Sequence, residues 1–203
     1  MFKSKMTLRH LRQLWQGHTL LEMADMIQLY ADGQKVAIQR EILKVPDSVV
    51  VLLYRCDNHK LILTSQWRAP IVVKGDDRPV IEACAGNIDS EDFNIAKGDA
   101  IQAAFLAAKR EVSEETGWHI KDLSFIYALY SSPGLMTEKL YYFIASVDSQ
   151  IHDGGGLRSE GEDITVLEIS LSEALNKIKD GEIIDLKTIV LLQHLQLHQC
   201  EFF

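Results

Sequence analysis

Three glutamates near the end of one predicted helix carry the clearest chemical signal in the chain. Glu111 and Glu115 are four positions apart and Glu114 is three from Glu111, so a helix puts all three carboxylates on one face. Like charges at this spacing destabilise a helix, and the negative end of its dipole adds to the repulsion. A hard divalent cation is a natural compensator, because Mg²⁺ and Mn²⁺ prefer carboxylate oxygens. The alternative is an exposed acidic helix end.

The residues around this cluster extend the pattern. From Arg110 to Trp118 the chain reads Arg-Glu-Val-Ser-Glu-Glu-Thr-Gly-Trp, which resembles the C-terminal half of the Nudix hydrolase signature at every specified position. Ala85-Gly86, after a strand-like run, resembles the approach to that signature. Other segments resemble the ADP-ribose pyrophosphatase and nucleoside diphosphate sugar hydrolase branch of the family: 66–70, 132–134 with Glu138, 154–156 with 160–164, and 179–183.

The first half of the signature departs from the family pattern. A glycine, five residues, a glutamate and seven residues should precede the arginine, but counting back from Arg110 finds Gln102 and Ala96. If Gly86 is the signature glycine, the loop before the helix is about ten residues longer than usual. The first glutamate is then missing or displaced, for example to Asp99.

The resemblance assigns roles to the acidic residues. It implies that Mg²⁺, or alternatively Mn²⁺, is held by the backbone carbonyl of Ala85 and by Glu111, Glu115 and Glu162. Glu160 and Glu114 are the candidate catalytic carboxylates, with Glu160 as a general base that activates water. The alternative for Glu160 is a solvated loop carboxylate.

Further residues are predicted to bind substrate. Arg68 is a candidate diphosphate ligand because a guanidinium can donate two parallel hydrogen bonds to phosphate oxygens. A structural salt bridge is an equally weighted alternative for Arg68. Glu82 either contacts the nucleoside or braces Arg68, and Glu138 is assigned to the sugar or water. Arg40 and Glu41 lie on an N-terminal strand that, by resemblance, reaches the site of a partner subunit in a homodimer.

The elements that position these residues predict an α+β (mixed α/β) fold. The resemblance specifies a Nudix-fold α/β/α sandwich with a mixed central sheet plus a small N-terminal β-sheet. Residues 1–46 are expected to form the N-terminal β region, a dimerisation element, and residues 47–203 the hydrolase domain. Helices are expected at 99–117, 170–179 and 186–199, strands at 48–54, 60–66, 80–84, 123–130, 140–147 and 164–169, and a strand hairpin within 17–43. Segments 70–77 and 87–97 are expected to be irregular, and 154–163 a flexible loop that closes over substrate.

Composition restricts the partners. The 203 residues carry a net charge of −8, so neither nucleic acid nor an anionic membrane is expected as a partner. Cys56, Cys84 and Cys200 follow neither a disulfide nor a zinc pattern and are expected to be free thiols in the cytoplasm. No apolar run resembles a signal peptide or is long enough to span a bilayer.

The resemblance to Nudix hydrolases, together with the carboxylate cluster, predicts an enzyme. The expected reaction is Mg²⁺-dependent hydrolysis of the diphosphate bond of a nucleoside diphosphate sugar, of the GDP-mannose, ADP-ribose or UDP-glucose type. The products are a nucleoside monophosphate and a sugar phosphate. One alternative is a catalytically weak Nudix domain that senses or binds nucleotide sugars, favoured by the missing glutamate. Another alternative is hydrolysis of a dinucleoside polyphosphate. This substrate is disfavoured by the combination of Arg68, the segment 132–134 and Glu160.

Overall fold

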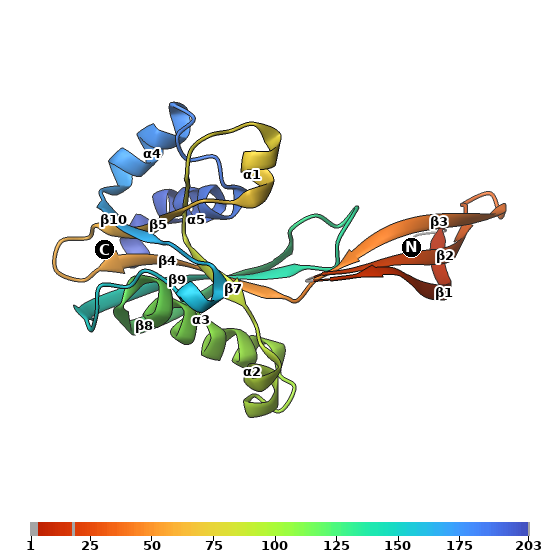
Figure 1. The fold of residues 1–203 in the computed structure, drawn as a ribbon, viewed down its shortest axis with the longest axis horizontal. Helices are drawn as coiled ribbons and strands as arrows, with labels where there is room; N and C mark the ends of the chain where they lie inside the picture. Colours follow the sequence, from red (N-terminus) through yellow and green to blue (C-terminus); the bar gives the residue numbers. More distant parts are fainter. Residues whose placement is uncertain (1–3, 18, 203) are drawn as a thin grey trace. The chain divides into compact units, whose positions relative to one another are not determined.

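The computed structural model describes residues 4–17 and 19–202, apart from the side chain of Glu160 (Figure 1). The chain divides into two compact units. The first contains residues 1–47 and 130–139, and the second contains residues 48–129 and 140–203.

The first unit is built on an antiparallel three-stranded sheet. Its strands β1 (Lys5–Gln16), β2 (Leu20–Leu29) and β3 (Lys35–Lys44) lie in sequence order, with a turn at Gly33 between β2 and β3. The segment 130–139 joins the end of β3, where Leu43 N–H donates to Leu135 O at 2.9 Å and Thr137 N–H donates to Leu43 O at 3.1 Å. The predicted N-terminal sheet is confirmed, and β1 adds a strand where the sequence indicated none.

The second unit contains a mixed sheet. Its strands follow the order β10-β5-β4-β9-β8, with β6 added beside β5 and β7 beside β4. The pair β4–β9 is parallel, whereas β4–β5, β4–β7, β5–β6 and β5–β10 are antiparallel. The bounds are β4 (Ser48–Arg55), β5 (Leu61–Gln66), β6 (Val80–Glu82), β7 (Cys84–Asn87), β8 (Trp118–Tyr130), β9 (Lys139–Gln150) and β10 (Thr165–Ile169).

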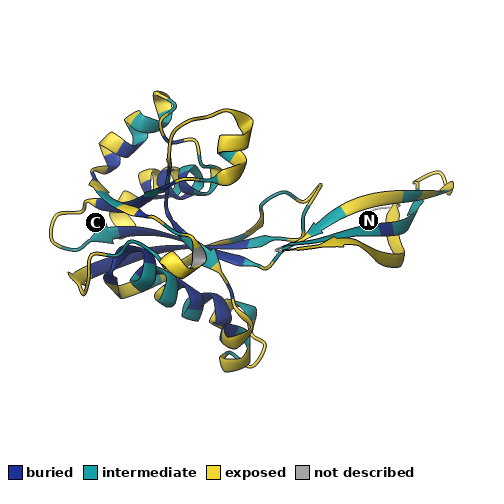
Figure 2. Ribbon diagram, in the orientation of Figure 1, coloured by how far each residue is buried: buried dark blue, intermediate teal, exposed yellow. Residues whose placement is uncertain are grey.

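Helices cover both faces of this sheet (Figures 1 and 2). Alternate residues of β4 separate the two cores, because successive side chains of a strand point to opposite faces. Val49, Val51 and Leu53 join the cluster that contains the alanines of α3 (Ala100–Thr116). Val50 and Leu52 join the cluster that contains leucines of α5 (Leu186–Leu197), and α4 (Leu171–Lys179) packs on the same side. The predicted mixed α/β/α sandwich is therefore confirmed.

Two short helices correct the expectation of irregular segments. α1 (Ala69–Lys74) replaces most of the predicted loop 70–77, with Pro70 in its first turn, where a missing N–H costs nothing, and left-handed Gly75 at its end. α2 (Ser90–Ile95) lies within 87–97 and begins with a capping box between Asp89 and Asp92. Both helices have six residues, too few for an apolar periodicity to appear. A short helix α6 (Gln199–Phe202) follows α5. Among the residues described, no helix is long and apolar enough to cross a membrane.

Candidate active site

Helix α3 carries the glutamate cluster, and its ends agree with the sequence prediction. Asp99 Oδ1 accepts the N–H groups of Ile101 at 2.9 Å and Gln102 at 3.0 Å, and Gly117 closes the helix at φ +72°. Asp99 lies twelve residues before Glu111, about 18 Å along a helix axis. Asp99 is therefore a helix cap and does not replace the first signature glutamate.

Glu111 and Glu115 point from α3 toward β7. The Glu111 carboxyl lies so close to Gly86 that any Cβ at that position would overlap it. Glu115 is only 2% exposed, and its Oε2 accepts the N–H of Ala85 at 3.3 Å. The glycine and the short strand β7 thus bring the backbone of Ala85 and Gly86 against two carboxylates.

The electrostatics of the cluster reflect crowding away from water. Burial, followed by the charges of Glu114 and Glu162, raises the pKa of Glu111 to about 7 despite the opposing effect of Arg110. Burial, followed by the charges of Glu111 and Glu162, raises the pKa of Glu115 to about 8. Glu162 contributes to both shifts, so it lies near the other two although it comes from a distant loop.

That loop is anchored to the end of α3 by its glycines. Gly155 N–H donates to Glu115 O at 2.9 Å and Gly156 N–H donates to Glu114 O at 3.3 Å, which satisfies carbonyls that a helix end leaves unpaired. Gly154, Gly155 and Gly156 all have positive φ, and a Cβ at Gly154 would lie 2.5 Å from Glu115 O. The glycines were expected to provide flexibility, but their contacts show close packing.

The acidic part of the loop follows a turn at Gly161, with φ +81° after the 3₁₀ turn η1 (Arg158–Glu160). Glu162 Oε2 accepts the N–H of Leu157 at 2.8 Å and lies against Gly156. The Glu160 side chain, the predicted general base, lies outside the described part of the structure.

Arg110 neutralises part of the cluster. Its Nη1 lies 2.7 Å from Glu111 Oε1 and 3.4 Å from Glu114 Oε2, so the brace suggested by the sequence is present. Its Nη2 lies 3.0 Å from Asp89 Oδ2 and 3.3 Å from Asp92 Oδ2. The catalytic candidate Glu114 therefore shares an arginine with three other carboxylates.

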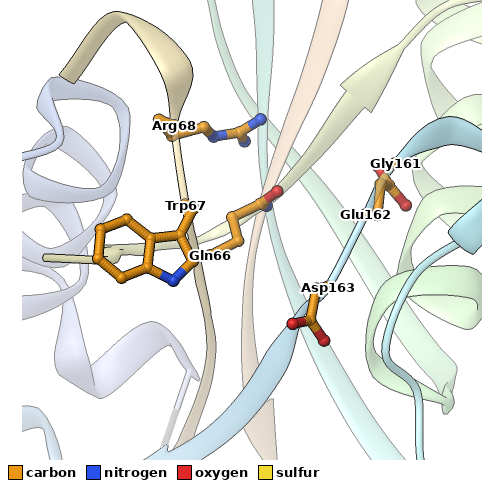
Figure 3. Close-up of a pocket in the computed structure, with 6 residues that line it drawn as sticks. All are labelled: Gln66, Trp67, Arg68, Gly161, Glu162 and Asp163. Atoms are coloured by element: carbon orange, nitrogen blue, oxygen red, sulfur yellow. The ribbon is translucent and has the colours of Figure 1, made fainter. Parts of the chain in front are cut away.

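A cavity of about 220 Å³ opens beside the acidic loop. Figure 3 shows Gln66 and Arg68 across from Glu162 and Asp163, and the lining is completed by Trp67 and Gly161. Arg68 Nε donates to Glu82 Oε2 at 2.8 Å, so the structure shows Glu82 bracing Arg68, one of the two alternatives for Glu82. The cavity has a cationic wall and an anionic wall, which suits an anion bound together with a cation.

The remaining substrate candidates belong to the first unit. Arg40 and Glu41 are exposed on β3, and Glu138 lies in the segment 130–139. Their contacts with substrate stay predictions.

Comparisons with known proteins identify the family. No family model matches the chain. Over 169 residues, which is 82% of this chain and 82% of each relative, it is 38% identical to GDP-mannose pyrophosphatase of Cronobacter sakazakii. Over the same length it is 36% identical to that of Escherichia coli and 35% identical to that of Shigella flexneri. This chain belongs to the Nudix hydrolase family. Its fold matches a solved structure of an ADP compounds hydrolase with a TM-score of 0.69, 18% identity and coverage of 95% of this chain and 92% of the other.

Within the Nudix family, the long signature loop can now be interpreted. Asp92 is the sixth residue after Gly86, the place of the first signature glutamate when counting starts from the glycine. Asp92 is only 7% exposed and contacts Arg110, and the residues between it and Arg110 include the second half of α2 and the first turns of α3. Sequence reasoning missed this residue because it counted back from Arg110, across the insertion. A forward count from Gly86 would have found it.

Nudix hydrolases generally use a divalent metal ion, and the donor groups around Glu111 and Glu115 decide whether this site suits one. The described residues include no group of three or more His, Cys, Asp or Glu side chains arranged to hold a metal ion. Arg110 contacts an oxygen of Glu111, and the Leu157 N–H donates to an oxygen of Glu162. The chemistry nevertheless fits a hard cation: burial and the mutual charges of Glu111, Glu115 and Glu162 raise the pKa of Glu111 and Glu115, and Glu115 also contacts the backbone of Ala85.

Proposed function

We propose that this chain hydrolyses the diphosphate bond of a nucleoside diphosphate sugar, with GDP-mannose as the first candidate, using Mg²⁺ or Mn²⁺. The products are a nucleoside monophosphate and a sugar phosphate. The observation that carries the proposal is the cavity with Arg68 on one wall and Glu162 on the other, beside the carboxylates of Glu111 and Glu115. The names of the relatives support the choice of substrate class.

The proposed division of labour follows from the chemistry of each group. Glu111, Glu115, Glu162 and the Ala85 carbonyl would hold the metal ion. When bound, the ion supplies neutralisation of the charge that develops on the phosphates. Arg68 binds the diphosphate through its guanidinium, and Glu160 takes a proton from the attacking water. Glu114, tied to Arg110, keeps that arginine beside the cluster.

The size of the cavity supports recognition of a diphosphate. A volume of about 220 Å³ is below the roughly 300–1,000 Å³ of a pocket that encloses a whole small ligand. The nucleoside and the sugar would therefore extend beyond it. We propose that Arg40 and Glu41 reach the site of a partner subunit in a homodimer, and that Glu138 contacts the sugar or water.

We further propose that residues 1–46 are a dimerisation element. All twelve residues of β1 are exposed, and five of them are large and apolar: Met6, Leu8, Leu11, Leu14 and Trp15. A long strand with an exposed apolar surface is a site for association, and a second copy of the chain is the usual partner. The free thiols of Cys56, Cys84 and Cys200 support a reducing, cytoplasmic location.

The sensor alternative loses its main argument. It depended on a missing first glutamate, whereas Asp92 occupies the corresponding position in the count and contacts Arg110 at 3.3 Å.

The function can be tested with a substrate panel. GDP-mannose, ADP-ribose, UDP-glucose and a dinucleoside polyphosphate are each incubated with Mg²⁺, Mn²⁺ or EDTA, and the released sugar phosphate and nucleotide are measured. We expect turnover of a nucleoside diphosphate sugar that stops in EDTA and returns when the metal is restored. Binding without turnover would support the sensor, and full turnover in excess chelator would contradict the metal role.

A further inference from the structure

A buried carboxylate behind the cavity lies between two cations. Glu82 is only 4% exposed, and its two oxygens have different partners. Oε2 accepts from Arg68 Nε at 2.8 Å, and Oε1 accepts from Lys187 Nζ at 3.4 Å. Because a buried charge is costly unless it is paired, the two cations offset the cost of burying the Glu82 carboxylate.

Lys187 is itself held in place by the start of α5. Its Nζ lies 2.6 Å from Asp185 Oδ1, and Asp185 Oδ2 accepts from the Thr188 N–H at 2.8 Å and from the Thr188 hydroxyl at 2.7 Å. The Thr188 hydroxyl accepts the N–H of Ala83 at 2.7 Å, next to Glu82 in the chain. Two separate hydrogen-bonded paths therefore connect α5 to the strand that carries Glu82.

The charge of Lys187 persists in this environment. Burial alone would lower the pKa of Lys187, but Asp185 and Glu82 outweigh burial and raise it. Lys187 thus places a positive charge at the oxygen of Glu82 that Arg68 does not bind.

This arrangement decides how Arg68 presents its guanidinium. Arg68 gives only Nε to Glu82, and among the described residues neither Nη1 nor Nη2 has a hydrogen-bond partner. Arg68 lines the cavity with its side chain 39% exposed, so these two groups are available to an anion. If Arg68 instead donated from Nε and one Nη to both oxygens of the carboxylate, only one Nη group would remain to bind an anion.

We propose that Lys187 is a positioning residue for diphosphate binding. By occupying Glu82 Oε1, Lys187 prevents Glu82 from forming a bidentate pair with Arg68, and this leaves both Nη groups of Arg68 facing the cavity. Without Lys187, the unpaired Oε1 of the buried Glu82 would attract an Arg68 Nη. The inference rests on the proposed function for its substrate, but the arrangement of Arg68 can be measured with a simple anion.

The test is a double-mutant cycle on Lys187 and Arg68. Calorimetry in EDTA measures the Kd for inorganic diphosphate, where only the cations of the chain can bind it, and kinetics with Mg²⁺ measure KM and kcat for GDP-mannose. We expect Lys187→Met to raise Kd and KM roughly tenfold and to change kcat less, because ground-state and transition-state binding are both weakened. Lys187→Arg should stay close to the wild type. In an Arg68→Met background, Lys187→Met should have little further effect, since coupled residues are not additive.

Two further variants keep the test decisive. Lys177→Met breaks an ion pair of 2.7 Å to Glu182 at α4, similar in length to the 2.6 Å pair of Lys187 with Asp185. This control variant should leave Kd and KM unchanged. If Lys187→Met does not fold, Asp185→Asn loosens Lys187 more gently and should raise Kd about two- to fivefold, again only when Arg68 is present. Additive effects of Lys187 and Arg68, or an unchanged Kd in a folded variant, would overturn the inference. Absence of turnover on every nucleotide sugar, with the coupling in Kd intact, would instead reject the proposed function alone.

Discussion

Replacing Gly154 by alanine tests how the acidic loop is held against α3. Gly154 has φ +73°, and an added Cβ would lie 2.5 Å from Glu115 O, 2.7 Å from Thr116 C and 2.9 Å from Thr116 Cα. All three are backbone atoms, so no side-chain rotation relieves the overlap. The loop must move away from the helix end or the last turn of α3 must distort.

A matched glycine separates the free-energy cost of the steric overlap from the cost of a left-handed alanine. Gly181 has φ +72°, and a Cβ added there would meet nothing within 4 Å, so Gly181→Ala carries only the cost of a left-handed alanine, about 1–2 kcal/mol. Gly154→Ala carries the same cost plus overpacking of about 1–3 kcal/mol, a total of about 2–5 kcal/mol. The effect of alanine on the unfolded chain is common to both variants and cancels in the comparison.

Urea unfolding of the two variants provides the measurement, with equal m-values as the check that both unfold in the same way. Gly154→Ala should also raise the Mg²⁺ concentration needed for half-maximal activity, because Glu162 is carried by the displaced loop, whereas Gly181→Ala should not. Equal loss of stability in the two variants, with an unchanged Mg²⁺ requirement, would refute the idea that the glycine contact positions the loop.

Four other predictions concern the acidic residues. Glu115→Gln should lower kcat at least about a hundredfold with the fold retained, as expected for a damaged charge-stabilising site; unchanged kinetics would make the cluster a solvated helix end. Glu162→Gln should raise the Mg²⁺ requirement, whereas Glu160→Gln should leave it normal and lower kcat by roughly 10²–10⁴, which paired Mg²⁺ titrations distinguish; wild-type kcat in Glu160→Gln would place the base elsewhere, with Glu138 next. The pKa of Glu115 is raised to about 8 from 4.5, so between these values the folded metal-free protein keeps a proton that the unfolded chain releases. The stabilisation from this proton is present below about pH 4.5 and is lost as the pH rises through about 8. In chelator, Tm should therefore fall over this pH window, and Glu115→Gln should flatten the fall. Asp92→Ala should lower the free energy of unfolding by about 1–3 kcal/mol and reduce kcat, because buried Asp92 pairs with Arg110. Asp89, whose side chain is 59% exposed, serves as the control, and Asp89→Ala should cost less than about 1 kcal/mol. Similar losses of stability in the two variants would contradict a special role for Asp92.

Local patterns in the sequence were sufficient for much of the fold and for the acidic cluster. The spacing of Glu111, Glu114 and Glu115, the cap at Asp99 and the glycine at 117 specify α3, because helical periodicity and capping depend on neighbouring residues. The nearly continuous apolar run at 48–54 likewise predicted a strand, and the structure buries both faces of β4. The short helices α1 and α2 escaped prediction, because six residues do not complete a readable period.

Tertiary structure decided which distant groups meet. The two alternatives for Glu82 could not be separated until Arg68 and Lys187, the latter 105 positions away, were found on its two oxygens. The contact between Asp92 and Arg110 forms across the inserted residues, and the glycines at 154–156 pack against the end of α3. Spacing along a chain encodes contacts within a helix turn or a strand pair, whereas contacts between separate elements depend on how the cores on both faces of the sheet pack. Sequence alone therefore predicted the carboxylates, and packing determined their partners.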